Sequence, residues 1–319
     1  MKVVIPQDIT AAGKDYLKER GYEIVIGTGN TDIEAMKAQI AGADAILART
    51  APYTAEVLAA APNLKVIGRH GIGVDNIDID YCTAHGIYVC NAPTSNGISV
   101  AEHTVGMILA CAHHFSLFDR GVRKGEWGFR NKYRSMDLEG KTLGLVGMGR
   151  IGSMVAKMCM AAFDMKVIGY DAYLPAERFP AGSTKVETME DVLKNADFVS
   201  LHVPSTPETR GSINKTTIGM MKPTAYLINC ARGEVVNEAD LYECLKNGVI
   251  AGAGIDVFPT EPPAKNCPLF ELDNIIMTPH SAALTQESMD RMGLHAAMGI
   301  HDALTGKKPQ WALNNPVGK

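Results

Sequence analysis

The chain has 319 residues, of which 46% are hydrophobic and 21% charged, and its formal net charge is −4. This length suits two domains, the lack of a basic block argues against a nucleic-acid surface, and no apolar stretch is long enough to span a bilayer. The amino terminus has the pattern of a first strand rather than a signal peptide. Seven cysteines without a Cys-x-x-Cys pair favour reduced thiols in the cytoplasm over disulfides or a zinc site.

Strand-like and helix-like segments alternate through the first part of the chain. We expect strands at Lys2–Pro6, Glu23–Gly27, Ala45–Arg49, Lys65–Gly68 and Tyr88–Asn91, and helices at Ile9–Arg20, Thr31–Ala41, Thr54–Ala60 and Ile79–Ala84. Alternation of this kind predicts a parallel sheet that is covered by helices on both faces.

The middle of the chain begins a second series. We expect one long apolar helix from Ser99 to about Lys124, a polar, arginine-rich loop over Gly125–Glu139, and then strands at Thr142–Val146, Met165–Tyr170, Asp197–His202, Ala225–Asn229, Ala253–Val257 and Ile275–Thr278. The last helix, roughly Gln286–Leu304, is expected to pack on the first domain. The pattern predicts an α/β fold with two Rossmann-like domains, in which residues 99–284 are inserted between residues 1–98 and 285–319.

A G-x-G-x-x-G motif, Gly147–Gly152, lies between a predicted strand and a predicted helix over Ser153–Ala162. The first glycine permits a tight turn, the second lets the backbone approach a pyrophosphate, and the third permits close helix packing. The next strand ends at Asp171, nineteen residues beyond Gly152. A carboxylate there hydrogen-bonds ribose hydroxyls and repels a 2′-phosphate, which favours NAD over NADP.

Three ionisable residues follow later strands of the same series: Arg232, Glu261 and His280. Because ligands bind at the carboxyl edge of a parallel sheet, this set suits the reduction of a keto acid. We expect His280 to be the acid/base, Glu261 to stabilise and orient its imidazole, and Arg232 to clamp the substrate carboxylate. The other eight histidines have no metal-ligand spacing.

Several motifs in chain order resemble the D-isomer-specific 2-hydroxyacid dehydrogenase family, and within it the 3-phosphoglycerate dehydrogenases. They are Gly68–Asp78, Ser99–Thr104, Gly147–Gly152, His202–Pro204, Asn229–Gly233, Ala253–Pro262 and Thr278–His280. The resemblance implies an NAD domain inserted into a flavodoxin-like substrate domain, with Arg232, Glu261 and His280 as the catalytic set. It also implies a homodimer or a dimer of dimers formed through Ser99–Gly140.

The resemblance further implies which residues contact the ligands. NAD contacts are expected, besides the motif glycines Gly147, Gly149 and Gly152, at Thr104, Arg150, Ile151, Asp171, His202, Pro204, Thr209, Cys230, Ala231 and Asp256. The substrate, a small anionic 2-hydroxy or 2-keto acid, is expected to meet Arg49, Arg69, Ile72, Gly73, Arg232 and His280, with Arg130 or Arg134 as a further cation from a partner subunit. The loop over Gly71–Val74 would bind its carboxylate through backbone amides.

The substrate stays open at this point. Arg49 and Arg69 match positions that contact the anionic tail in phosphoglycerate dehydrogenases, whereas Ser281–Thr285 departs from their usual pattern, and the chain ends where longer relatives continue into a regulatory domain. Hydroxypyruvate, glyoxylate, lactate and sulfolactate are alternatives to 3-phosphoglycerate. A non-enzymatic NAD-sensing scaffold would need a groove for a partner peptide and usually carries disordered tails. A dehydrogenase of formate or phosphite is a third alternative, but formate dehydrogenases lack the carboxylate partner that Glu261 supplies here.

Overall fold

The computed structural model describes residues 1–318, which form two compact units. One unit comprises residues 1–97 together with the carboxyl-terminal segment from 283 onward, and the other comprises residues 98–282. The boundaries expected from the sequence, after residue 98 and after residue 284, lie within two residues of these. None of the helices in the described part of the chain combines the length and apolar character needed to cross a bilayer.

The first unit is built on a parallel sheet of five strands in the order β2-β1-β3-β4-β5. The strands are β1 (Lys2–Ile5), β2 (Glu23–Ile26), β3 (Ala45–Ala48), β4 (Val66–Arg69) and β5 (Tyr88–Cys90). The helices are α1 (Ala11–Lys18), α2 (Ile33–Ile40), α3 (Ala55–Leu58), α4 (Ile79–Ala84) and α12 (Gln286–Leu304). This strand order is that of the flavodoxin-like fold.

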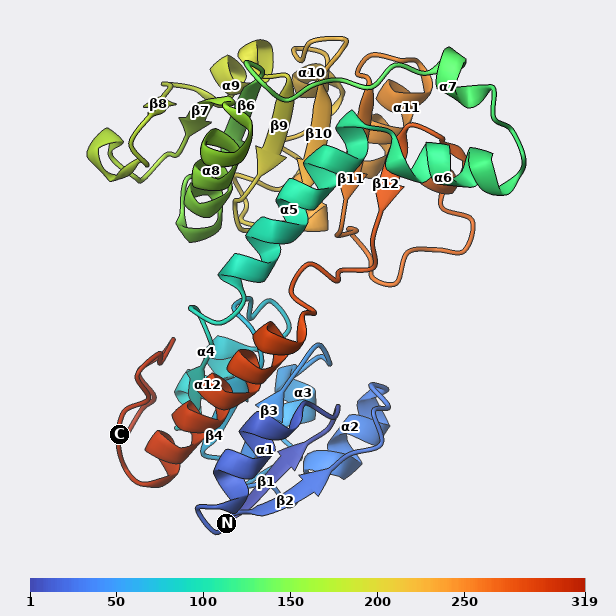
Figure 1. The fold of residues 1–319 in the computed structure, drawn as a ribbon. Coiled ribbons are helices and arrows are strands. Elements are labelled where there is room, and N and C mark those ends of the chain that lie inside the picture. The colour runs from blue at the N-terminus through green and yellow to red at the C-terminus, as the bar shows by residue number, and fades with distance from the viewer. Residues whose placement is uncertain (319) are drawn as a thin grey trace. The chain divides into compact units, whose positions relative to one another are not determined.

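Two apolar cores lie on the two faces of this sheet. One is formed with α1 and α12 and includes Val3, Leu47 and Ile300, while the other includes Val4, Met36 and Ile67. Two glycines allow α12 to pack closely, because a Cβ at Gly13 would lie 2.5 Å from the Gly293 carbonyl oxygen and one at Gly68 would lie 2.6 Å from that of Ala296. The last helix thus belongs to the first sheet, although it follows the second sheet in the sequence (Figure 1).

The second unit is built on a parallel sheet of seven strands in the order β12-β11-β10-β9-β6-β7-β8. The strands are β6 (Thr142–Val146), β7 (Lys166–Tyr170), β8 (Ser183–Lys185), β9 (Phe198–Leu201), β10 (Tyr226–Asn229), β11 (Gly252–Ile255) and β12 (Ile275–Met277). The strand order reverses between β6 and β9, the kind of switch point at which open α/β sheets bind ligands. Strand β8 was not predicted, because its short polar Ser-Thr-Lys sequence lacks an apolar pattern.

Helices cover both faces of this sheet (Figure 1). They are α5 (Gly97–Ala112), α6 (Phe115–Arg123), α7 (Phe129–Lys132), α8 (Arg150–Phe163), α9 (Met189–Asn195), α10 (Lys215–Ile218) and α11 (Glu238–Lys246). Short 3-10 turns lie at Ala176–Arg178, Gly233–Val235 and Pro268–Glu271.

The single long helix predicted from Ser99 to Lys124 is wrong. The helix α5 ends at Ala112 and α6 begins at Phe115, because His114 between them adopts a left-handed backbone with a φ of 53°. No glycine or proline marks this break, so the apolar pattern continues through it in the sequence. The loop predicted over Gly125–Glu139 contains the short helix α7.

Candidate active site

The three motif glycines of the second unit have the conformations and contacts that a nucleotide loop requires. Gly147 has a φ of +95°, and a Cβ there would lie 2.5 Å from the His202 carbonyl oxygen. A Cβ at Gly152 would lie 2.3 Å from the Gly147 oxygen, so helix and strand touch closely, whereas a Cβ at Gly149 would meet nothing within 4 Å. The loop therefore leaves open space at Gly149, where α8 presents its N-terminal amides to an anion.

Asp171 is held in place at the end of β7 by backbone amides. Its carboxylate accepts hydrogen bonds from the amides of Met148 (2.8 Å), Tyr173 (3.0 Å) and Leu174 (2.9 Å). Partial burial opposes ionisation of this carboxyl, but the three amide bonds outweigh it and lower its pKa. Asp171 thus stays negatively charged, and its hydrogen bond from the Met148 amide holds it beside the glycine loop.

His202 follows β9, the strand next to β6 across the switch point. Its Nε2 lies 3.0 Å from the Ser200 hydroxyl oxygen, and burial lowers its pKa to about 4, which keeps the imidazole neutral at physiological pH. Two residues farther on, Pro204 is exposed, and its carbonyl accepts a 2.6 Å hydrogen bond from the Thr209 hydroxyl.

His280 and Glu261 form a direct pair. The His280 Nδ1 lies 2.7 Å from the Glu261 Oε2, and the other carboxylate oxygen accepts a 3.0 Å hydrogen bond from the Phe258 amide. Partial burial raises the pKa of Glu261, but the bonds from His280 and Phe258 and the charge of Arg232 prevail and lower it. The His280 side chain is 48% exposed.

Asp256 holds the loop that carries His280. Its side chain is 1% exposed, its Oδ1 accepts bonds from the Thr278 hydroxyl (2.5 Å) and the Ser281 amide (2.8 Å), and its Oδ2 accepts one from the Ala282 amide (3.0 Å). His280 itself has a φ of 49°, and its amide donates to the Asp256 carbonyl at 2.7 Å. The Asp256 carboxylate, expected to contact NAD, is therefore turned inward onto this loop.

Arg232 lies in the loop after β10, against the loop that carries Glu261. The Asn229 side chain closes the Arg232 turn, because its Nδ2 donates to the Arg232 carbonyl (2.9 Å) and its Oδ1 accepts from the Ala231 amide (3.0 Å). A Cβ at Gly233 would lie 2.0 Å from the Phe258 carbonyl carbon, so only glycine permits this contact between the two loops. The structure thus brings Arg232, Glu261 and His280 together. Sequence reasoning gave Asn229 no role of its own, although this residue begins the motif Asn229–Gly233.

Three residues expected to contact NAD have little or no free surface. Thr104 is fully buried and its hydroxyl donates to the Val100 carbonyl at 2.8 Å, while Cys230 is 8% and Ala231 9% exposed. Arg150 is exposed and Ile151 half-buried, both at the start of α8.

The order of the strands spreads these groups along one sheet edge. Asp171 follows β7, the glycine loop follows the adjacent β6, and Arg232 follows β10. Neighbouring strands lie about 4.8 Å apart, so the three steps from β7 to β10 span roughly 14 Å. The edge therefore suits an elongated ligand with one polar end at Asp171, its anionic centre at the glycine loop and its reactive end near Arg232. No group of side chains with metal-ligand geometry occurs among residues 1–318.

Two arginines predicted to bind substrate lie in the first unit. Arg49 follows β3 and Arg69 ends β4, so both stand at the carboxyl edge of the five-stranded sheet. The Arg49 Nη1 donates to the Asp8 carbonyl at 2.9 Å, and the Arg69 Nη1 donates to the His70 carbonyl. Burial, reinforced by the charges of both arginines, lowers the pKa of His70 to about 4. This edge thus carries two permanent cations beside a neutral histidine.

The loop after β4 provides backbone groups at the same edge. Gly71 has a φ of 141°, and the Ile72 carbonyl accepts a 2.8 Å hydrogen bond from the Asn91 side chain. Ile72 and Gly73 are half-buried. The structure thus brings Ile72 and Gly73 to the same sheet edge as Arg49 and Arg69.

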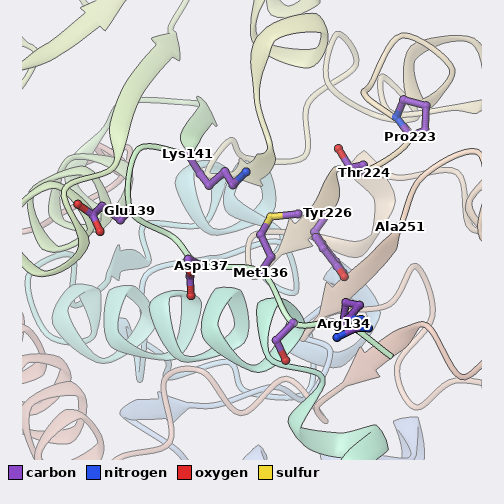
Figure 2. A pocket seen from close by; sticks show the side chains of 10 residues that line it. Arg134, Met136, Asp137, Glu139, Lys141, Pro223, Thr224, Tyr226 and Ala251 are labelled. Carbon is purple, nitrogen blue, oxygen red and sulfur yellow. The ribbon is translucent and has the colours of Figure 1, made fainter. Parts of the chain in front are cut away.

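An open pocket of about 650 Å³ lies at the amino-terminal edge of the seven-stranded sheet, opposite the edge that carries the glycine loop (Figure 2). Its walls include Lys141, which precedes β6, Thr224 and Tyr226 at the start of β10, and Ala251 before β11. The segment Arg134–Asp137 forms another side of it. This pocket is separate from the carboxyl-edge loops and contains none of the residues predicted for catalysis or cofactor binding.

Comparison with known proteins supports the relationship inferred from the motifs. The family model "D-isomer specific 2-hydroxyacid dehydrogenase, NAD binding domain" matches residues 105–282. D-3-phosphoglycerate dehydrogenases of Archaeoglobus fulgidus and Methanocaldococcus jannaschii are 40% and 42% identical over 99% of this chain. The chain spans 60% of the length of each of these two relatives.

Two solved structures match nearly the whole of both chains. The TT0316 protein of Thermus thermophilus is 33% identical, with a TM-score of 0.90 over 98% of this chain and 100% of its own. The D-lactate dehydrogenase of Aquifex aeolicus, solved with NAD and lactic acid, is 32% identical, with a TM-score of 0.84 over 99% and 100%. The predicted fold class and resemblance are confirmed. The chain belongs to the D-isomer specific 2-hydroxyacid dehydrogenase family.

Proposed function

We propose that this protein is an NAD-dependent dehydrogenase that interconverts a small 2-keto acid and its (R)-2-hydroxy acid. The observation that carries the proposal is the His280–Glu261 pair, 2.7 Å apart, on the sheet edge that also carries the glycine loop. When bound, NADH supplies the hydride. The residues of the chain supply the proton, the charge that binds the substrate carboxylate, and the hydrogen bonds that hold these groups in place.

His280 acts as the acid in keto-acid reduction and as the base in the reverse direction. Its Nδ1 is engaged by Glu261, so the Nε2 gives its proton to the carbonyl oxygen as negative charge develops there. Glu261, whose pKa is lowered, is ionised at neutral pH and stabilises the imidazolium. The carboxylate also accepts a hydrogen bond from the Phe258 amide. Because the backbone fixes its position in this way, Glu261 orients the imidazole ring.

Arg232 binds the substrate carboxylate and polarises the adjacent carbonyl. A guanidinium presents two parallel N–H donors that match a carboxylate. The contact between Gly233 and the Phe258–Pro259 peptide keeps this cation near the imidazole–carboxylate pair. The substrate would therefore lie with its carboxylate toward Arg232 and its carbonyl oxygen toward His280.

The specific substrate that we propose is 3-phosphoglycerate, with 3-phosphohydroxypyruvate as its oxidised form. The support is the identity of about 40% to two enzymes that bear that name and the two cations Arg49 and Arg69 at one sheet edge. Arginines of this kind suit a phosphate tail, because guanidinium–phosphate pairs are among the stronger hydrogen bonds in proteins.

We further propose that the protein forms a homodimer, or a dimer of dimers, through Ser99–Gly140. This segment exposes Phe115 (56%), Val122 (57%) and Trp127 (67%), large apolar side chains of the type that subunit interfaces cover. Sedimentation equilibrium of the wild type and of a Val122→Glu, Trp127→Glu double variant tests this. A monomeric wild type would contradict the proposal, and dissociation of the double variant would support it.

The proposed compartment is the cytoplasm. All seven cysteines are unpaired and buried, and burial raises the pKa of the Cys111 and Cys230 thiols to about 12. Thiols kept protonated in this way fit a reducing environment.

The decisive experiment measures kcat and KM with NADH and with NADPH for a panel of 2-keto acids. The panel contains 3-phosphohydroxypyruvate, hydroxypyruvate, glyoxylate, pyruvate and 3-sulfopyruvate. We expect the highest kcat/KM with NADH and 3-phosphohydroxypyruvate. A higher kcat/KM with another acid would make that acid the proposed substrate. Absence of NADH oxidation with every acid in the panel would refute the proposed dehydrogenase activity.

A further inference from the structure

The His103 side chain, on α5, contacts the loop that carries His280. Its Nε2 lies 3.1 Å from the Thr278 hydroxyl oxygen and 3.6 Å from the Asp256 Oδ1, and its side chain is 24% exposed. We propose that His103 is a positioning residue for His280, acting through Thr278 and Asp256. This inference rests on the proposed function, because it explains how that function's acid is held in place.

The directions of the hydrogen bonds follow from the donors available. The Thr278 hydroxyl has one hydrogen, and at 2.5 Å from the Asp256 Oδ1 it donates to that carboxylate. Toward His103 the same oxygen must therefore accept, so the His103 Nε2 carries a proton. The result is a chain of donors that runs from His103 through Thr278 to the buried carboxylate.

Asp256 connects this chain to the catalytic loop. Its carboxylate accepts hydrogen bonds from the amides of Ser281 and Ala282, and its backbone carbonyl accepts one from the amide of His280. A buried charge is tolerated only while hydrogen-bond donors surround it. His103 is the basic side chain that the described residues place within 4 Å of this carboxylate. Loss of His103 thus removes one hydrogen-bond donor from the Thr278 hydroxyl, which itself donates to Asp256.

The loop needs this support because His280 has a left-handed backbone. Its φ of 49° is unfavourable for a residue other than glycine and persists only when the surrounding bonds hold it. The amides of residues 280, 281 and 282 each donate to Asp256. When Asp256 is less well held, the loop relaxes and the His280 ring loses its alignment with the substrate oxygen, while the glycine loop and Arg232 are unaffected.

The experiment uses the full chain and compares three variants. His103→Leu removes the donor, His103→Gln places an amide N–H near the same position, and His85→Leu is the control, because the exposed His85 ring stacks on Tyr81 in the first unit. Two readouts are taken for each variant. The first readout is kcat and KM for the keto acid with the highest kcat/KM in the panel, together with the Kd for NADH. The second is amide hydrogen exchange in peptides that cover residues 278–284.

We expect His103→Leu to lower kcat about tenfold, the scale of a small misplacement of a reacting group, while the Kd for NADH changes less than twofold. Exchange in residues 280–282 should become about tenfold faster, whereas peptides that cover β9 stay unchanged. His103→Gln should recover most of both properties, and His85→Leu should match the wild type. Should His103→Leu fail to fold, His103→Asn, whose amide is too short to reach Thr278, takes its place.

A double-variant cycle with Thr278→Val tests the route. If His103 acts through Thr278, the variant that carries both changes is no slower than the slower single variant, and fully additive losses would overturn the route. If amide hydrogen exchange in residues 280–282 is as slow in His103→Leu as in the wild type, His103 does not position this loop. That result would overturn the proposal whether or not the protein turns over any acid. An inactive wild type would refute only the dehydrogenase, because the exchange data still decide what His103 does.

Discussion

The carboxyl edges of the two sheets differ in what their loops carry. In the seven-stranded sheet, acidic groups and imidazoles are paired with one another, as in the His280–Glu261 pair and the buried Asp256 beside His103. In the five-stranded sheet, Arg49 and Arg69 donate to the backbone carbonyls of Asp8 and His70. Two sheets with the same parallel architecture therefore offer different chemistry: one edge suits proton transfer, and the other suits the binding of an anion.

The largest expected effect tests the proton-transfer edge. His280→Ala should lower kcat at least about a hundredfold, the usual contribution of an acid/base, while the Kd for NADH, measured by fluorescence titration, stays within about twofold. Arg232→Ala should also lower turnover at least about a hundredfold, because that edge acts as a unit. His85→Ala, at an exposed position of the first unit, is the control. Turnover near the wild-type level in His280→Ala would remove the assignment.

Each unit contains a histidine that desolvation keeps neutral, which allows the two units to be compared by their stability in acid. The pKa values of His70 and His202 are lowered from 6.5 to about 4. Each lowered pKa reduces the free energy of unfolding as the pH falls from 6.5 toward 4, because the imidazole binds a proton in the unfolded state but stays neutral in the folded state. The cost at pH 5 is about 2 kcal/mol for each residue, relative to pH 7.

Urea unfolding of His70→Gln and His202→Gln at pH 7 and pH 5 measures these costs. Each variant should lose about 2 kcal/mol less than the wild type between the two pH values. His85→Gln, at an exposed position of the first unit, should behave like the wild type. An equal pH dependence in all four proteins would mean that these imidazoles titrate normally.

The anion-binding edge is tested by removing one cation at a time. Arg49→Ala and Arg69→Ala should each raise the KM for 3-phosphohydroxypyruvate about tenfold, since a charge-assisted bond contributes roughly 1.5–3 kcal/mol, with less change for pyruvate. Arg20→Ala, an exposed arginine that bonds the Tyr16 carbonyl in the same unit, controls for net charge. Equal changes in KM for both acids would show that these cations do not select a phosphate.

The smallest expected effect concerns the choice of cofactor. Asp171→Asn removes the negative charge beside the glycine loop but retains an acceptor for the Met148 amide. The ratio of kcat/KM for NADH to that for NADPH should fall about fivefold, because one repulsive charge near a solvent-exposed 2′-phosphate contributes roughly 1 kcal/mol. An unchanged ratio would count against Asp171 as the specificity residue.

Local patterns predicted most of the strands and the glycine loop, because they rest on short-range rules. Gly147 and Gly152 are needed for a positive φ and a close contact, which depend on few neighbouring atoms. The break between α5 and α6 was not predictable in this way, because His114 carries no signal of a left-handed backbone. The short polar strand β8 exists because it pairs with β7, and its own sequence does not favour a strand.

The sequence by itself determined the family and the fold class, and it predicted Arg232, Glu261 and His280 as one set, because strand ends in a parallel sheet share one edge. Only the tertiary structure decided that Asp256 points inward, that Thr104 is fully buried and that His103 contacts Thr278. Residues 103, 256 and 278 lie on three elements far apart along the chain. Their contacts depend on how α5 packs against β11 and β12, and no periodicity within a single segment encodes that packing.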